Sequence, residues 1–326
     1  MRRLLAALGA ILLLGGASGA REWRWALPPG IAPPPVPADD PMSPAKVELG
    51  RRLFYDADLS IDGTMACATC HEQHRSFGDG NATHGGVHGE PGRRNVPGLA
   101  NVAWARPLTW ADSRIETLEA QAAVPLFGLH PVEMGMAGQP AAIPQRLGRD
   151  DCYRRMFAAA FPESGGAIDL AKTSRALAAF QRTLLSFDTP YDRFLRGMLD
   201  AIPPQAKRGA AAFAAACAGC HSGADFTDRG FHALVADSQD RGLGEATGRV
   251  ADDRRFRTPG LRNVALTAPY LHDGSAATLA QAIRRHAPAS DAELPDLLAF
   301  MDTLTDRTFV TDPRFSLPKT HCGKKP

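Results

Sequence analysis

Two stretches of this chain, Cys67-Ala68-Thr69-Cys70-His71 and Cys217-Ala218-Gly219-Cys220-His221, share the pattern Cys-x-x-Cys-His. In each, two thiols lie one helical turn apart and an imidazole follows directly. That spacing is typical of c-type haem attachment, in which the thiols bond to the two vinyl groups of one porphyrin and the histidine ligates the iron. The sequence therefore predicts two covalently bound c-type haems, with Cys67, Cys70, Cys217 and Cys220 as attachment points and His71 and His221 as iron ligands.

Other uses of paired cysteines fit this pattern less well. A zinc site would draw on both cysteine pairs together, and a redox-active dithiol needs no following histidine. The remaining cysteines are Cys152 and Cys322. They either form a disulfide in an oxidising compartment or stay separate thiols. The sequence does not decide between these alternatives, because it cannot place the two Cβ atoms.

The first twenty residues predict export from the cytoplasm. Arg2 and Arg3 precede an apolar run over residues 4–14, and only small residues follow up to Ala20. This order indicates a signal peptide over residues 1–20, cleaved after Ala20. The alternative is an uncleaved anchor, but the run is shorter than the roughly 20 residues that span a bilayer. We expect a periplasmic protein with no membrane contact after cleavage, in agreement with haem attachment outside the cytoplasm.

Composition excludes some other classes of protein. The chain has 326 residues, 44% of them hydrophobic, with 37 Lys+Arg against 35 Asp+Glu. These fractions are typical of a globular protein. The expected leader holds two arginines and no acid, so the mature chain has 35 residues of each sign. Without a clustered basic surface, nucleic acid is not an expected partner.

The two motifs lie 150 residues apart, which suggests one haem per domain. Prolines and a glycine interrupt the chain between Thr189 and Pro204, so we expect one domain over residues 21–190 and another over 191–326. Capping residues predict helices that begin near Ser43, Asp169, Thr278 and Ser290, and the Ala-rich stretch Pro204–Ala216 predicts another. The expected fold is mainly α, with two cytochrome c-like domains, each wrapped around one haem, and long Gly/Pro-rich loops.

The two motifs and their flanks resemble the bacterial dihaem cytochrome c peroxidase family, which includes the methylamine-utilisation enzyme MauG. The matching stretches outside the motifs are Leu49–Asp56 (LGRRLFYD) and Leu261–Gly274 (LRNVALTAPYLHDG). Three further stretches look most like the branch of the methanobactin-associated dihaem enzyme MbnH: Asp40–Ser43 (DPMS), Leu108–Trp110 (LTW) and Phe127–Gly135 (FGLHPVEMG). The resemblance covers nearly the whole mature chain.

The resemblance implies that the first haem reacts with hydrogen peroxide and that the second relays electrons. Glu133 matches the acid that moves a proton between the two peroxide oxygens; from the sequence alone it is indistinguishable from a surface glutamate. His88, in the Gly-rich loop 85–95, matches a histidine that can occupy the sixth position of the first haem at rest. The alternative for His88 is a solvent-facing loop residue.

The second haem needs a sixth ligand, for which the family uses Met or Tyr. The matching position here is His286, a departure that implies a lower reduction potential than Met would give. The alternative is that His286 is a cation at a helix C-terminus, with Met301 as the spare ligand. His272, in the stretch 270–275, is close in sequence to the expected pocket of the second haem, where we expect it to contact a haem propionate or an iron ligand and not to bind the iron itself.

Two further roles are implied only by the resemblance. Trp110 matches the tryptophan between the haems that can pass electrons, with Trp104 as the fallback. Asn95, Thr267 and Pro269 match oxygen donors to a calcium ion.

These features leave three functions open. A MauG- or MbnH-type enzyme would use peroxide to oxidise a Trp or Tyr residue of a protein partner. A cytochrome c peroxidase would reduce peroxide to water with electrons from a small cytochrome c or cupredoxin. A non-enzymatic electron carrier would have two six-coordinate haems and no peroxide reaction. The departure at His286 and the resemblance to the MbnH branch favour the first.

Overall fold

The computed structural model describes residues 23–233, 239–286 and 290–320. The expected leader and Cys322 lie outside these ranges. None of the helices within them is long and apolar enough to cross a membrane.

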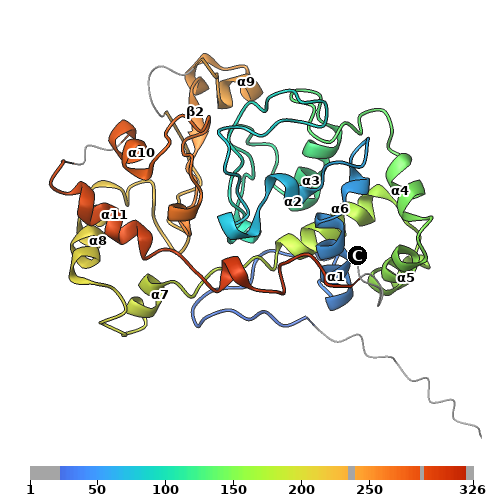
Figure 1. Ribbon diagram of the computed structural model, residues 1–326, viewed down its shortest axis with the longest axis horizontal. Helices are drawn as coiled ribbons and strands as arrows, with labels where there is room; N and C mark the ends of the chain where they lie inside the picture. Colours follow the sequence, from blue (N-terminus) through green and yellow to red (C-terminus); the bar gives the residue numbers. More distant parts are fainter. Residues whose placement is uncertain (1–22, 234–238, 287–289, 321–326) are drawn as a thin grey trace, which may run out of the picture.

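Helices dominate the described chain, as expected (Figure 1). The α-helices are α1 (Pro44–Phe54), α2 (Cys67–Cys70), α3 (Leu118–Phe127), α4 (Ala142–Leu147), α5 (Asp151–Ala160), α6 (Leu170–Gln181), α7 (Pro190–Leu195), α8 (Pro204–Ala216), α9 (Leu243–Thr247), α10 (Leu279–His286) and α11 (Leu294–Asp302). The short 3-10 turns are η1 (Ala57–Leu59), η2 (Gln73–Arg75), η3 (Val102–Trp104), η4 (Pro162–Ser164), η5 (Val250–Asp252), η6 (Val264–Leu266) and η7 (Phe309–Thr311). Within the same ranges, the named strands are β1 (Phe231–Ala233) and β2 (Arg255–Arg257), which pair antiparallel with Phe231 opposite Arg257.

The capping residues begin the helices that they predict. Ser43 accepts a hydrogen bond from the Lys46 amide at the start of α1, and Asp169 caps α6 in the same way. Thr278 and Gln281 exchange hydrogen bonds at the start of α10. Satisfying the free amides of the first turn in this way fixes where a helix begins.

One helix begins later than its capping pattern suggests. Ser290 and Glu293 exchange the expected hydrogen bonds, but they close a separate turn, and α11 starts only at Leu294. Pro295 lies in the first turn of α11, where its missing N–H costs nothing, so the helix is positioned by the proline and not by the serine.

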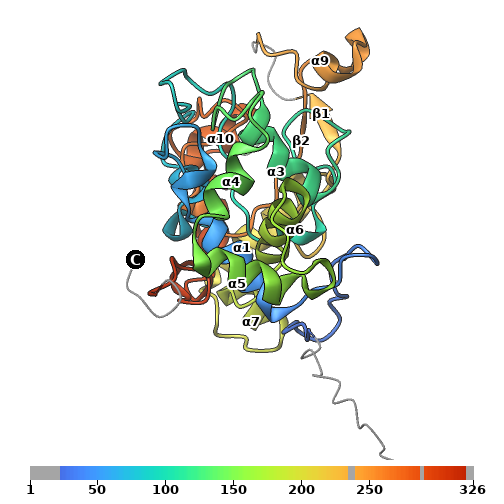
Figure 2. The same cartoon turned by 90° about the vertical axis from the view of Figure 1, so that its right-hand side faces the viewer.

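Each half of the molecule contains one pair of closely packed helices that cross at a glycine. Figure 2 shows α1 and α6 packed together, and α8 packs on α11 in the other half. In the first crossing, a Cβ on Gly50 would lie 1.8 Å from the carbonyl oxygen of Ala176. In the second, a Cβ on Gly209 would lie 1.9 Å from the carbonyl oxygen of Asp296. Only glycine allows either pair of helices to approach so closely.

Each crossing supports its own hydrophobic cluster and its own Cys-x-x-Cys-His motif. The first cluster includes Leu49, Phe54 and Phe180, and Cys67 packs against it. The second includes Phe213 and Phe300, with Cys217 against it. Each motif thus packs against a cluster of its own, and the division of the chain into two domains stays a prediction.

The end of the chain returns to the first unit. From α11 it runs back toward α1, as Figure 1 shows in red. Phe309 and Phe315 are buried in the first cluster, and the Tyr55 hydroxyl donates a 2.7 Å hydrogen bond to the carbonyl of Phe315. The expected unit 191–326 therefore contains a final segment that packs on the other unit.

Cys152 lies in α5, beside the first cluster, and is disulfide-bonded. The four motif cysteines form no disulfide. The predicted partner, Cys322, is outside the described residues.

The first crossing can be tested by Gly50→Ala. We expect a loss of about 1–3 kcal/mol in the free energy of unfolding, because the added methyl group must push α1 and α6 apart. Gly85→Ala is the control, since the nearest atom to its Cβ position, the carbonyl oxygen of Glu90, lies at an ordinary contact distance of 3.7 Å. Denaturant unfolding of the holoprotein measures both, and equal stability of the two variants would contradict the close approach of the helices.

Candidate functional site

The first motif forms the short helix α2, and His71 follows it directly. The His71 Nδ1 donates to the carbonyl oxygen of Phe77 at 2.6 Å, which fixes the ring and leaves Nε2 as the nitrogen that can bind a metal. Burial lowers the pKa of His71, so the imidazole is held neutral, which is the form that ligates a metal. These features are those of an iron ligand.

The motif thiols are not set up for redox exchange. Burial raises the pKa of Cys67 to about 12 and that of Cys70 to about 12, and the nearby carboxylate of Glu133 adds to both shifts. A redox-active Cys-x-x-Cys pair needs a lowered thiol pKa, because the thiolate is the nucleophile. The dithiol alternative is therefore disfavoured for this motif.

Glu133 lies near the first motif, close enough for its charge to act on both motif thiols. Its segment is fixed on both sides, because the Val87 amide donates to the Glu133 carbonyl and the Ile61 amide donates to the Met134 carbonyl. Burial raises the pKa of Glu133, and the nearby His84 opposes this shift. A half-buried carboxyl with a raised pKa holds a proton more readily than an exposed glutamate does, which suits a group that takes up and releases a proton.

His88 lies elsewhere in the same region. It is exposed, in a turn closed by a 2.8 Å hydrogen bond from the Gly89 amide to the Gly86 carbonyl. A Cβ on Gly86 would lie 1.8 Å from the carbonyl oxygen of Val132, so only glycine lets this loop pack on the Glu133 segment. The structure thus brings the loop to the first motif but places His88 in solvent, and its role as a sixth ligand stays a prediction.

The second motif opens into a cavity of about 400 Å³ between the two halves of the chain. Cys217, Cys220, His221 and His286 all line this cavity. The His221 Nδ1 donates to the carbonyl of Phe226 at 3.0 Å, and burial lowers the pKa of His221. The second imidazole is therefore prepared for metal binding in the same way as the first.

His286 faces His221, as the sixth-ligand prediction requires. The two rings have their centroids 6.3 Å apart. The His286 Nδ1 donates to the carbonyl of Ala282 at 2.7 Å, again leaving Nε2 free. Two metal–imidazole bonds of about 2.0 Å, with roughly half a ring beyond each nitrogen, span about 6 Å. The pair therefore fits one iron held between two imidazoles.

Met301, the alternative ligand, lines the same cavity but is packed differently. It is buried on α11 among the apolar side chains of the second cluster, including Phe300 and Leu297. His286 has the geometry of a ligand opposite His221, and Met301 has the surroundings of a core residue.

Arg257 is a residue of this cavity that the sequence analysis missed. It is buried, and its guanidinium donates to the backbone carbonyls of Thr109 and Thr258, with no ion pair to a described carboxylate. Burial, with repulsion from Arg229, lowers the pKa of Arg257 to about 10. A buried cation of this kind fits an acidic group, and haem carries two propionates. No signal in the sequence separates Arg257 from Arg255 on the same strand, which is exposed.

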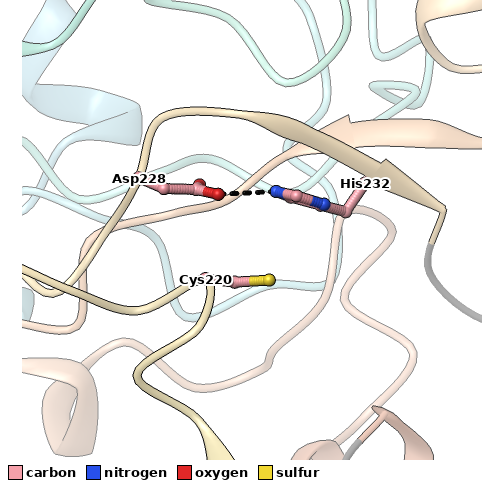
Figure 3. Close-up of side chains that lie close together, drawn as sticks. All are labelled: Cys220, Asp228 and His232. Atoms are coloured by element: carbon pink, nitrogen blue, oxygen red, sulfur yellow. Dashed lines mark hydrogen bonds and ion pairs between the residues drawn. The ribbon is translucent and has the colours of Figure 1, made fainter.

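A small cluster lies at the edge of the second motif, where Figure 3 shows Cys220 beside Asp228 and His232. Their ligand atoms lie within 4.8 Å of one another, and His232 donates to Asp228 at 2.7 Å. Among the described residues this is the one group of three or more such side chains close enough to hold a metal ion, and it contains a single cysteine. The two cysteine pairs thus do not combine into a zinc site.

Trp110 is firmly held between the two units. Its indole N–H donates to the carbonyl of Asn95 at 2.7 Å, and its own carbonyl accepts from the Arg257 amide at 2.8 Å. The ring lines the cavity of the second motif. Trp104 is half-buried and packs edge-on against Phe187. Of the two tryptophans, only Trp110 lies in this cavity wall, as the prediction requires.

The predicted calcium ligands lie together on the wall of the same cavity. Asn95, Thr267 and Pro269 all line it. The Asn95 side-chain amide donates to the carbonyls of Asn81 and Ala82, which leaves its oxygen as an available ligand. Calcium binding remains a prediction. His272 is buried close by, stacked on Phe256 with ring centroids 3.7 Å apart.

Comparisons with known proteins agree with this geometry. Residues 44–200 match the family model described as di-haem cytochrome c peroxidase. The chain is 36% identical to the methylamine utilization protein MauG of Methylophilus methylotrophus over 83% of this chain and 85% of that protein. It is 32% identical to the cytochrome c551 peroxidase of Pseudomonas aeruginosa, covering 85% of this chain and 82% of that one. Among solved structures, a MauG-like protein associated with microbial copper homeostasis superposes with a TM-score of 0.85 at 40% identity, over 91% of this chain and 99% of the other.

Proposed function

Because the chain belongs to the dihaem cytochrome c peroxidase and MauG family of peroxidase-type oxidoreductases, we propose that it is a periplasmic enzyme that uses hydrogen peroxide to oxidise a residue of a protein partner. The observation that carries this proposal is that different side chains lie at the two motifs. A half-buried carboxyl lies near the first motif, and a pair of facing imidazoles lies at the second.

At the first motif the chain supplies a ligand and a proton carrier. Cys67, Cys70 and His71 would hold one haem, whose iron supplies the position at which peroxide binds and its O–O bond is cleaved. Glu133 accepts the proton of the peroxide oxygen nearer the iron and returns it to the farther oxygen, which leaves as water. The buried surroundings that raise the pKa of Glu133 make both proton transfers possible at one carboxyl.

At the second motif the chain supplies a closed coordination site. Cys217 and Cys220 would hold the other haem, and His221 and His286 would both ligate its iron. Two imidazoles give a lower reduction potential than an imidazole and a thioether, so a haem held here would supply the chemistry of a ready electron donor. Trp110, fixed by hydrogen bonds on both sides, is the proposed bridge between the two centres.

The electrons are proposed to come from a tryptophan or tyrosine of a protein partner. The bis-imidazole pair, the 36% identity to MauG and the 40% identity to a MauG-like protein support this choice. The second candidate is a peroxidase with a small cytochrome c or cupredoxin as the electron donor, which the similarity to cytochrome c551 peroxidase favours.

Stopped-flow spectroscopy separates the two candidates. The holoprotein is mixed with peroxide, and reduced cytochrome c is then added. We expect an oxidised form that persists for seconds and oxidises cytochrome c slowly. Rapid catalytic oxidation of cytochrome c would instead identify the peroxidase, and no spectral change with peroxide would rule out both.

A further inference from the structure

The turn that follows the first motif has an unusual backbone conformation. His71 Nδ1 donates to the carbonyl of Phe77 at 2.6 Å, and the chain between them is closed by hydrogen bonds from the Phe77 and Gly78 ends to Glu72. Ser76 and Phe77 both have positive φ angles, 57° and 61°. For residues with a Cβ atom this left-handed region is costly, and it persists only where the surrounding structure holds it. The carbonyl that accepts from His71 therefore depends on contacts that the turn makes with the rest of the molecule.

One of these contacts comes from the end of the chain. We call residues 309–316 the C-terminal strap. The ring of Phe309 packs on the ring of Phe77, with centroids 5.7 Å apart, and both side chains are buried. Phe54 on α1 packs on the same Phe77 ring, with centroids 5.9 Å apart. The residue that supplies the carbonyl is thus held between α1 and the strap.

The strap also holds the beginning of the turn. Gln73 lies two residues after His71, and its side-chain amide donates to the carbonyls of Phe309 and Asp312 at 3.4 and 2.8 Å. Its side-chain oxygen accepts from the Ser316 hydroxyl at 2.9 Å. The strap therefore contacts the turn on both sides of the hydrogen bond that orients His71.

The strap is itself fixed to both halves of the chain. Just before it, the buried Asp306 accepts from the Phe309 amide at 3.0 Å, and its own amide donates to the side chain of Asn263 at 2.7 Å. Near its end, Arg51 on α1 donates to the carbonyl of Ser316 at 3.2 Å. A segment anchored in this way can keep a costly turn in place.

The corresponding turn of the second motif is held from within its own cluster. His221 donates to the carbonyl of Phe226 at 3.0 Å, and Phe226 also has a positive φ, 54°. Its ring packs on Phe213 and Phe300, with centroids 5.9 and 6.3 Å apart. The two motifs share the design of the turn, and the first differs in that a segment distant in sequence supports it.

We propose that the C-terminal strap sets the hydrogen bond of His71, with Phe309 and Gln73 as its positioning residues. A carbonyl that accepts from Nδ1 makes the imidazole a stronger donor through Nε2. A stronger donor stabilises oxidised iron and so lowers the reduction potential of the centre. The inference rests on the proposed function only for His71 as the iron ligand.

The reduction potential of the first centre tests the strap without peroxide or turnover. Phe309→Leu removes the ring that supports Phe77, and Gln73→Ala releases the beginning of the turn. In each holoprotein we expect spectroelectrochemistry to show a higher potential for the first centre and the parental potential for the second. The iron–histidine stretching band of the ferrous first centre, followed by resonance Raman spectroscopy, should move to lower frequency.

The direction of the shift separates this role from simple loosening of the fold. A looser structure admits water, which stabilises oxidised iron and lowers the potential, whereas a weaker hydrogen bond at His71 raises it. Gln73 is half-buried, so Gln73→Ala provides the test even if Phe309→Leu does not fold.

Two matched controls complete the experiment. Phe157 is a fully buried phenylalanine of the same cluster that packs on Phe161, and Gln145 is an exposed glutamine of α4. Phe157→Leu should lower the stability, as Phe309→Leu does, and both Phe157→Leu and Gln145→Ala should keep the parental potential of the first centre.

An unchanged or lowered potential in folded Phe309→Leu or in Gln73→Ala would overturn the proposal, as would an equal rise in Phe157→Leu. A protein that shows the expected shifts but does not react with peroxide would reject the proposed function and leave this inference standing.

Discussion

Replacing His286 with alanine is expected to remove the low-spin signal of the second centre from the electron paramagnetic resonance spectrum of the ferric holoprotein. The second iron would lose its sixth ligand and become high-spin or take up water. Outside the second motif itself, no other substitution in the described chain should change the spectrum of this centre as much, because His286 is the described imidazole that faces His221 across the cavity.

The geometry gives the reason for this expectation. His286 is the last residue of α10, and its Nδ1 is tied to the carbonyl of Ala282 one turn earlier. The helix thus sets the direction of the ring, and the 6.3 Å separation from His221 is that of two imidazoles on one metal ion. A helix C-terminal cation would also lie here, but it would not need to face another histidine.

Two companion variants complete the test. Met301→Leu keeps the packing of the second cluster and should leave the spectrum unchanged, because Met301 is a core residue in this account. His286→Met should retain a low-spin centre and raise its reduction potential, since a thioether favours the reduced iron. Loss of the signal in Met301→Leu with an unchanged spectrum in His286→Ala would exchange the two assignments.

Replacing Glu133 with glutamine is expected to slow the reaction with peroxide by about 10²–10⁴-fold, the usual contribution of a positioned acid–base group. Glutamine has nearly the same size and keeps the packing, but it cannot accept the peroxide proton. The rate of spectral change under pseudo-first-order peroxide concentrations is the measurement.

The pH dependence of the same reaction follows from the burial of Glu133. The carboxylate is the active form for the first proton transfer, and burial raises its pKa above the usual value for glutamate. The rate should therefore rise with pH through a midpoint above that of an exposed glutamate. This limb should be absent in Glu133→Gln.

Glu90→Gln is the matched control for both measurements. Glu90 is an exposed glutamate of the neighbouring loop, whose backbone carbonyl rather than its side chain holds the turn. It should react at the parental rate with the parental pH profile. A Glu133→Gln variant as fast as Glu90→Gln would show that the carboxyl is not the proton carrier.

Local sequence signals predicted the helices well because they act within one turn. Ser43, Asp169 and Thr278 cap the helices that they were expected to cap, and the Ala-rich stretch from Pro204 is α8 to the residue. The late start of α11 was not predicted. The capping pattern of Ser290 and Glu293 and the nearby Pro295 both indicate a helix start, and the sequence does not show which of them sets it.

The site was predictable in part. The spacing of the motifs indicates which cysteines and histidines act together, and the resemblance to a known family pointed to Glu133 and His286. Contacts between residues that are distant in sequence could not be predicted. That His221 faces His286, for example, depends on where α10 packs. Arg257 was missed because its position in the cavity comes from burial and from hydrogen bonds to two backbone carbonyls, which no spacing in the sequence reveals.

The central claim is that the two motifs act as one unit on peroxide, and a single-equivalent titration tests it most directly. One equivalent of peroxide is added to the ferric holoprotein, and absorption and electron paramagnetic resonance spectra follow both centres. The account predicts that the high-spin signal of the first centre and the low-spin signal of the second fall together and return together when a reductant is added. Loss of the first signal with an unchanged low-spin signal would contradict it.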